Sequence, residues 1–298
     1  MTDATRSPRT DGAREQCRGL AAQVNLGWGI VIVCAAVGLA VGALLFVRRY
    51  APAGSVFEDG DRAAGVFGVL ATGFAILLGL IVFLAFSSYD QSRSGAETEA
   101  LAVAQQYETA QFMPVAVRQQ LGAQLVCYSR SVIHQEWPAL EAGTQPEGFS
   151  PWGLEMFRTL KTADPRTVTE QSAYDKWLDR NADREAARQD RMHGAVGVIP
   201  ISLWVVLFFI SAVIFAFILL FADSGERWFA QAMLIGSVVA VITATLLLIN
   251  VLDHPVQAGF GGLKPVAMER TVQILDQERK VTGDHGPLPC DANGAPVR

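Results

Sequence analysis

The fold is decided by the stretch AGVFGVLATGFAILLGLIVFLAFS, residues 64–87, which contains no charged side chain. A helix rises about 1.5 Å per residue, so roughly 20 apolar residues cross the hydrocarbon core of a bilayer. Lipid offers the backbone no hydrogen-bond partner, so a run of this kind must satisfy its own backbone as a helix. Buried helices of soluble proteins are seldom so long and so free of charge. The stretch predicts a transmembrane helix.

Three further charge-free runs repeat this pattern at residues 26–47, 194–222 and 228–252. The third span is expected to begin after Pro200, because proline suits the first turn of a helix. The first run is longer than the roughly 7–15 apolar residues of a signal peptide, so we expect it to be a retained span. The sequence therefore predicts an integral membrane protein with four transmembrane helices.

Most of the polar sequence lies between the second and third spans, over residues 88–193. Residues 92–113 contain no helix breaker except Gly95 and can continue the second span into water. After Pro114, apolar side chains recur every three or four residues, as in one stripe of an amphipathic helix. These side chains are Val117, Leu121, Leu125, Tyr128 and Val132. No strand-like alternation stands out, so the predicted class is all-α.

The expected organisation has three parts. Residues 1–25 form a disordered cytoplasmic tail, and residues 26–252 form a four-span membrane domain that contains a helical cytoplasmic insert at 88–193. Residues 253–298 form a cytoplasmic region with one helix and a disordered, Gly- and Pro-rich end.

Basic residues near the spans indicate which side of the membrane is cytoplasmic. Residues 1–25, the insert 88–193 and residues 253–298 share one side and contain most of the Lys and Arg. The other side contains Arg48, Arg49, Arg62 and Arg227. We therefore expect a multi-pass protein of the plasma membrane with both termini cytoplasmic.

Several function classes are disfavoured by composition and motifs. The net charge of −5 argues against a nucleic-acid partner. The cysteines, Cys17, Cys34, Cys127 and Cys290, show no CxxC spacing and do not resemble a metal site or a disulfide scaffold. No HExxH, GxSxG or phosphate-loop motif is present, so we expect no enzyme activity, metal or cofactor. Asp and Glu are absent from the span interiors, which argues against a proton-coupled carrier but not against a passive pore.

The second span carries the first candidate site. Thr72, Ile76, Leu80 and Phe83 share one helix face, and in a ring of subunits this face would form an apolar neck. The span also contains many small residues, among them Gly68 and Gly79. A plainer interpretation is that these let the helix pack closely among its neighbours.

Two further patterns lie outside the spans. Lys176, Arg180, Arg184 and Arg188 recur every four residues and predict either an anion-concentrating vestibule wall or a solvated face balanced by nearby acids. The balancing acids are Asp179, Asp183 and Glu185. Asp253 and Pro255 follow the fourth span and predict either a structured turn or a simple helix end.

Several short motifs occur in a fixed order around the spans. They are Ile76-Leu77-Leu78-Gly79-Leu80, Ser88-Tyr89-Asp90 with Arg93 and Glu97, Tyr128 with Glu136-Trp137-Pro138, Pro200 with Trp204, and Asp253-His254-Pro255 followed by Gly259, Leu263 and Pro265. Over roughly residues 64–275 the chain resembles the bestrophin-like family, bacterial membrane proteins related to bestrophin anion channels.

The resemblance implies a helical homo-oligomer, a pentamer by analogy, whose second span lines a central pore. Thr72, Ile76, Leu80 and Phe83 would then form the neck, and small inorganic anions would be the permeant species. The chain departs from eukaryotic bestrophins at residues 257–262, which lack the acidic calcium-binding run. His254 and Val256 also depart from the Asp-Pro-Phe pattern.

Two hypotheses about function remain open at this point. The first is an oligomeric ion channel that is anion-selective by analogy. The second is a non-conducting membrane scaffold or signalling protein whose helices at 88–193 bind a cytoplasmic partner.

Overall fold

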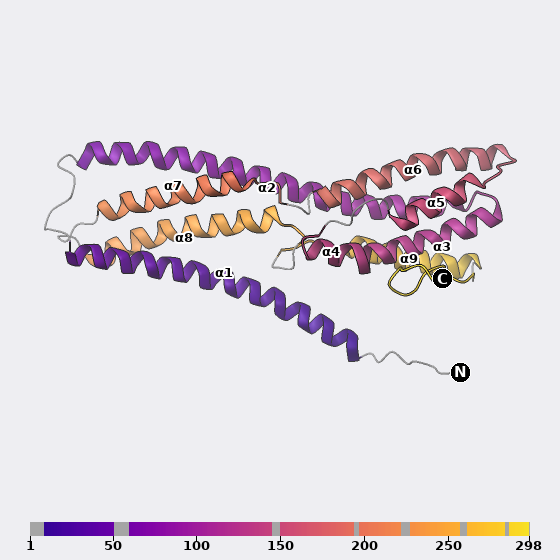
Figure 1. Ribbon diagram of the computed structural model, residues 1–298, viewed down its shortest axis with the longest axis horizontal. Coiled ribbons are helices and arrows are strands. Elements are labelled where there is room, and N and C mark those ends of the chain that lie inside the picture. The colour runs from indigo at the N-terminus through magenta and orange to yellow at the C-terminus, as the bar shows by residue number, and fades with distance from the viewer. Residues whose placement is uncertain are drawn as a thin grey trace. The chain divides into compact units, whose positions relative to one another are not determined.

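The computed structural model describes residues 9–50, 60–144, 150–193, 197–221, 227–256, 261–283 and 286–297, with side chains from residue 27 onward. The helices are α1 (Arg9–Tyr50), α2 (Gly60–Ala110), α3 (Val115–Ser131), a π-helical turn η1 (Val132–Glu136), α4 (Trp137–Glu141), α5 (Pro151–Lys161), α6 (Val168–His193), α7 (Ile201–Leu220), α8 (Trp228–Asp253) and α9 (Val266–Thr282) (Figure 1). Over these ranges the only strand-like pairing is an isolated bridge between Cys290 and Pro296. The all-α prediction is confirmed.

The chain forms two compact units. The membrane unit comprises residues 1–87, 197–253 and 258–261, and the soluble unit comprises the remaining residues. Helix α2 contributes to both, because it runs without interruption from Gly60 to Ala110. The prediction that the second span continues as a helix beyond residue 92 is therefore confirmed.

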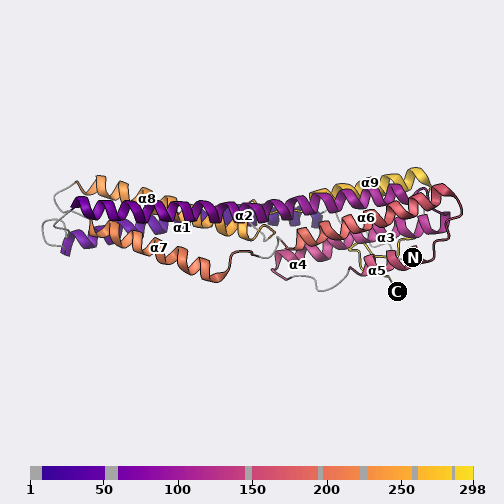
Figure 2. The same cartoon turned by 90° about the horizontal axis from the view of Figure 1, so that it is seen from above.

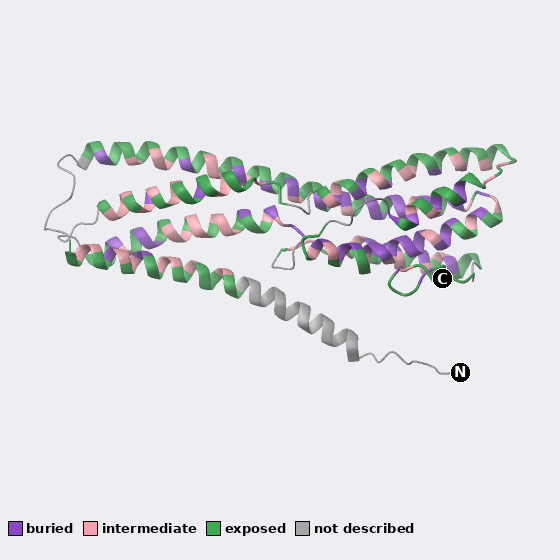
Figure 3. Cartoon of the chain, viewed as in Figure 1, coloured by how far each residue is buried: buried purple, intermediate pink, exposed green. Residues whose placement is uncertain are grey.

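The membrane unit contains four helices that are long and apolar enough to cross a bilayer, as the sequence predicted. The helices that contain these apolar spans are Gly27–Tyr50, Asp61–Ala110, Ile201–Leu220 and Trp228–Asp253. Helix α1 lies along α8, where Ala40 and Leu44 pack against Ile235 (Figures 1 and 2). Most of the outward-facing side chains of these helices are exposed in the single chain (Figure 3), as expected of helices surrounded by lipid or by other subunits.

Helix α1 begins earlier than expected. The structure places residues 9–25 in the helix, whereas the sequence predicted a disordered tail over residues 1–25. Residues 1–8 lie outside the described part of the chain. Residues 9–25 contain no proline, and extending an existing helix avoids the cost of nucleating a new one.

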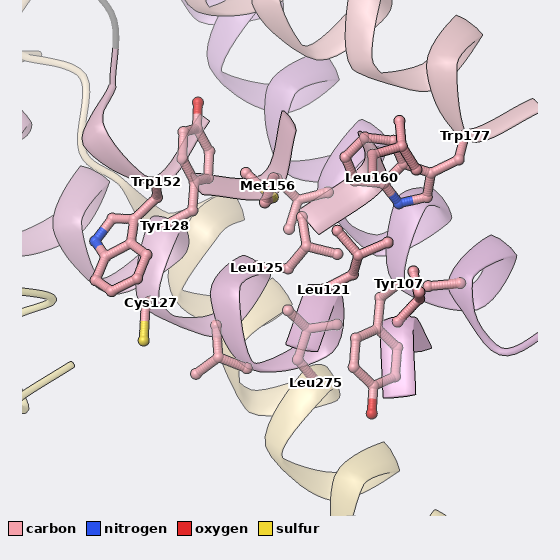
Figure 4. Close-up of a cluster of buried hydrophobic side chains, with 14 of the residues drawn as sticks. Tyr107, Leu121, Leu125, Cys127, Tyr128, Trp152, Met156, Leu160, Trp177 and Leu275 are labelled. Carbon is pink, nitrogen blue, oxygen red and sulfur yellow. The ribbon is translucent and has the colours of Figure 1, made fainter. Parts of the chain in front are cut away.

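The soluble unit is built around a large hydrophobic cluster, and a smaller one forms around Trp137 and Leu140. The apolar stripe of α3 is entirely buried, which confirms the prediction made for residues 117–132. Leu121 and Leu125 of α3 meet Met156 of α5, Trp177 of α6 and Leu275 of α9 in the cluster of Figure 4. Burial of this cluster holds the helices together, because each large apolar side chain contributes about 1.5–3 kcal/mol when it is removed from water.

The end of the chain differs from expectation. The predicted helix is present as α9, but residues 286–297 are folded against the soluble unit rather than disordered. A disulfide joins Cys290 to Cys127 of α3. The two cysteines are 163 residues apart, so no local spacing pattern could have indicated that they pair.

Candidate functional site

One face of α2 in the membrane unit is exposed and is not covered by the described residues of the chain. Ile76, Leu80 and Phe83 are 70, 55 and 66% exposed, and Thr72 is also exposed. The Thr72 hydroxyl donates a hydrogen bond to the Gly68 carbonyl at 2.8 Å, so its polar group is satisfied within the helix. The four residues predicted from sequence therefore lie together on a continuous, mainly apolar surface.

The opposite face of α2 accounts for the packing of this helix. Phe74 and Ile81 are buried against Leu207 and Ile214 of α7 and Ile249 of α8. The division follows from helical periodicity, because residues three or four apart share a face. The surface formed by Thr72, Ile76, Leu80 and Phe83, here called the α2 face, is left to contact lipid, a second subunit or a pore.

The glycines of α2 that lie in the membrane unit serve no close contact with the described part of the chain. A Cβ added to Gly65, Gly68, Gly73 or Gly79 would meet nothing within 4 Å. By contrast, a Cβ added to Gly236 of α8 would lie 3.3 Å from Val37 of α1. Glycine costs about 1 kcal/mol relative to alanine inside a helix. Its repeated use in α2 is therefore unexplained by the single chain and fits a close approach by another subunit.

The soluble unit contains a buried cluster of charged side chains, and α2 and α6 supply its central pair. Arg191 Nε donates to Glu99 Oε2 at 2.5 Å, and Arg191 Nη2 donates to Glu136 Oε2 at 2.6 Å. Gly95 allows this arrangement, because a Cβ there would lie 2.6 Å from the Arg191 backbone nitrogen. The sequence marked Gly95 only as a helix breaker, whereas the structure shows that it lets α6 approach α2.

Three more side chains complete the ion-pair cluster. Tyr128 donates its hydroxyl to Glu99 Oε1 at 2.5 Å, and Arg188 donates from Nη2 to Glu136 Oε1 at 2.9 Å. The Arg184 guanidinium lies 4.7 Å from the centre of the Tyr128 ring. Buried charges are tolerated when they are paired and hydrogen-bonded. We define the ion-pair cluster as Glu99, Tyr128, Glu136, Arg184, Arg188 and Arg191.

The cluster changes the ionisation of its members. Burial alone would raise the pKa of Glu136, but the charges of Arg191 and Arg188 outweigh burial and hold that pKa below its ordinary value. Burial, aided by the charge of Glu99, raises the pKa of Tyr128 well above its ordinary value. At neutral pH Glu136 is therefore an ionised carboxylate, and Tyr128 is a neutral phenol that donates a hydrogen bond.

The four basic residues of α6 that were predicted to share a face do not form one solvent-facing surface. Lys176 is exposed and Arg180 is partly exposed, but Arg184 and Arg188 are buried. The expectation that all four form a vestibule wall is wrong for Arg184 and Arg188, because they are enclosed by the soluble unit. Three of the four instead pair with the acids named in the plainer interpretation: Lys176 with Asp179, Arg180 with Asp183 and Arg184 with Glu185. Arg188 pairs with Glu136.

Asp253 forms a structured turn at the end of α8. Its buried Oδ1 accepts hydrogen bonds from the backbone nitrogens of Val198 at 2.7 Å and Ile199 at 3.0 Å, just before α7 begins. In the soluble unit, the Pro255 carbonyl accepts a hydrogen bond from the Leu263 nitrogen at 2.7 Å. Residues 257–260 lie outside the described part of the chain. The described residues contain no group of three or more His, Cys, Asp or Glu that could hold a metal ion.

Sequence reasoning found the α2 face and Asp253 but missed the centre of the ion-pair cluster. It singled out Tyr128 and Glu136 only as motif residues, and it gave Glu99 and Arg191 no joint role. A charged residue is ordinarily expected at the surface, and nothing in the local sequence reveals a partner 92 residues away.

Four apolar spans and a helical soluble unit define a helical membrane protein. The chain matches the family model of the Bestrophin-like domain over residues 34–261, and it therefore belongs to that family.

Solved structures show the same fold. A bestrophin homologue from Klebsiella pneumoniae carrying a point mutation is 15% identical, with a TM-score of 0.59, and the match covers 87% of this chain and 99% of that chain. A second Klebsiella variant is 17% identical, with a TM-score of 0.58 and coverages of 87% and 98%. A structure described as a membrane protein is 16% identical, with a TM-score of 0.61 and coverages of 87% and 99%. A comparison with curated protein sequences gives no match.

Proposed function

We propose that this protein is an ion channel of the plasma membrane formed by a ring of identical subunits. The observation that carries the proposal is the unpartnered α2 face, in which Thr72, Ile76, Leu80 and Phe83 form one surface. Arranged around an axis, this surface makes an apolar neck that can close by dewetting without any charged gate. By analogy with bestrophins, the ring is a pentamer and the permeant species are small inorganic anions.

The glycines support close packing between subunits. Without a hydrophobic driving force in lipid, helices associate through small residues that let their backbones approach. Gly65, Gly68 and Gly79 lie on α2 near the α2 face, and a Cβ added to any of them would meet no described atom within 4 Å. In the proposed ring, the neighbouring subunit occupies the space that their missing side chains leave open.

Chloride flux into liposomes tests conduction. Purified protein should carry chloride, and the double substitution Ile76→Ala with Leu80→Ala should increase the flux because a wider, less apolar neck stays wet. Leu39→Ala is the matched control, since Leu39 is an exposed leucine on α1. No flux in the parent protein together with no leak in the double variant would contradict the proposal and favour a non-conducting scaffold.

Mass determination of the detergent-solubilised complex tests the ring. We expect a homo-oligomer, and we expect Gly79→Leu to reduce its mass while leaving the subunit folded. The subunit should tolerate this substitution because no atom lies within 4 Å of the added Cβ. A monomer in the parent protein, or an unchanged mass in the variant, would argue against α2 at a subunit contact.

A further inference from the structure

The disulfide between Cys127 and Cys290 lies inside the soluble unit. Cys127 is on α3, Cys290 is in the segment 286–297, and both side chains are buried in the core cluster that also contains Trp152. Figure 4 shows Cys127 and Trp152 among these core side chains. The bond is therefore part of the packed interior rather than an exposed bridge at the surface.

The segment 286–297 is docked by more than the disulfide. Trp152 Nε1 donates to the Gly294 carbonyl at 2.7 Å, and Gln135 Nε2 donates to the Asn293 carbonyl at 3.0 Å. Gly294 has φ +79° and lies so close to α3 that an added Cβ would collide with the backbone of Ser131. Only glycine meets both requirements without strain.

The segment also holds its own shape. Asp291 Oδ1 accepts hydrogen bonds from the backbone nitrogens of Asn293 at 2.8 Å and Ala295 at 2.9 Å. This turn presents the Gly294 carbonyl to Trp152 and places Cys290 beside Cys127. The disulfide is buried, and the Asp291 turn and the close contact at Gly294 hold its segment in place. These are properties of a structural disulfide, since labile or regulatory disulfides are typically exposed or strained.

Structural disulfides persist in oxidising compartments, whereas cytosolic reductants keep thiols reduced. We propose that the soluble unit lies on the non-cytoplasmic side of the membrane. The two thiols lose two electrons and two protons to the disulfide of a thiol oxidant in that compartment, which becomes a dithiol as the Cys127–Cys290 bond forms. The span ends at Tyr50, Asp61, Leu220 and Trp228 then face the cytoplasm.

The distribution of arginines is consistent with this orientation. Basic residues determine topology mainly through short loops, because long segments cross the membrane largely regardless of charge. The short connections between α1 and α2 and between α7 and α8 are flanked by Arg48, Arg49, Arg62 and Arg227. In the long segment between α2 and α7, Arg184, Arg188 and Arg191 are buried beside carboxylates and present no exposed charge to the membrane surface. All three belong to the basic residues on which the expectation of cytoplasmic termini rests.

The first test asks whether the bond exists in cells. Cells producing the full chain are quenched with acid, and the denatured protein is treated with a polyethylene-glycol maleimide. Of the four cysteines, we expect Cys17 and Cys34 to react at once and Cys127 and Cys290 to react only after reduction. The gel should therefore show two adducts before reductant and four after it. Four adducts without reductant would overturn the proposal.

The second test asks on which side the soluble unit lies. In a background with Cys17→Ser and Cys34→Ser, Val281→Cys adds a reporter to α9, where Val281 is 87% exposed. Asp61→Cys adds a matched reporter at the start of α2, where Asp61 is also exposed. A membrane-impermeant maleimide applied to spheroplasts should label Val281→Cys, and should label Asp61→Cys only after detergent opens the membrane.

The labelling of the two reporter cysteines and the adduct count on the gel together test the proposed orientation. If Val281→Cys reacts only after detergent, or if Asp61→Cys reacts without it, the proposal is wrong. A disulfide found with the soluble unit on the cytoplasmic side would instead identify a redox-responsive bond. Detergent-treated samples of both variants show that each reporter is reactive, so a failure to label cannot be mistaken for protection.

Discussion

Arg191 and Glu99 form an ion pair in which neither side chain is exposed, with 2.5 Å between Nε and Oε2. Removing one member of such a pair leaves an uncompensated buried charge and typically costs about 3–5 kcal/mol. We predict that Arg191→Met lowers the free energy of unfolding of the soluble unit by this order, measured as a lower melting temperature in detergent by circular dichroism.

Arg93→Met is the matched control, because Arg93 pairs with Glu97 at 3.1 Å with both side chains more than half exposed. Exposed pairs contribute little to stability. Equal melting temperatures for the two variants would contradict the view that the ion-pair cluster holds α6 against α2.

The ion-pair cluster should also make the stability of the soluble unit depend on pH in the acidic range. The pKa of Glu136 is lowered in the folded state from an ordinary value of 4.5. Its stabilising contribution is therefore present in full above pH 4.5 and is lost as the pH falls through the lower, folded-state pKa, where the unfolded chain binds the proton more tightly.

We expect the melting temperature of Glu136→Gln to fall less than that of the parent protein as the pH is lowered from about 6 to about 3. This range includes the ordinary pKa of a carboxyl group. Glu155→Gln replaces a partly exposed carboxylate of α5 and should retain the parent dependence. A Glu136→Gln profile that follows the parent profile would show that this carboxylate is not ionised in the folded cluster.

The disulfide should stabilise the soluble unit. It closes a loop of 163 residues, for which chain entropy predicts a stabilisation of up to about 5 kcal/mol. Cys127→Ser should therefore lower the melting temperature. Reductant should lower the melting temperature of the parent protein but leave that of the Cys127→Ser variant unchanged. Cys34→Ser should change neither, because Cys34 is free. A parent melting temperature that reductant leaves unchanged would argue against a stabilising bond.

The sequence was most informative where a pattern is local. Charge-free runs of 20 or more residues located the spans, and a spacing of three and four located the buried stripe of α3 at Leu121 and Leu125. Both patterns follow from the helical repeat, which operates between near neighbours in the chain.

The predictions that were wrong concern contacts between residues far apart in the sequence. The four-residue spacing of basic residues on α6 includes an exposed position at Lys176 and a buried one at Arg188. The difference arises because Glu136, the carboxylate that covers Arg188, belongs to another helix. Cys290 and Gly294 lie in a Gly- and Pro-rich stretch that looks disordered until Cys127 and Trp152 are brought beside it. Amino-acid composition alone predicts neither the burial of Arg188 nor the docking of Cys290 and Gly294.

Modification of a cysteine on the α2 face tests the central claim most directly. Ile76→Cys, in a background with Cys17→Ser and Cys34→Ser, is reconstituted in liposomes, and chloride flux is measured before and after a charged, water-soluble thiol reagent. Leu39→Cys on α1 is the matched control, because Leu39 and Ile76 are exposed to similar extents. A pore lined by α2 predicts that the reagent changes flux through Ile76→Cys and leaves Leu39→Cys unaffected. Flux that is identical in the two variants before and after treatment would contradict the account.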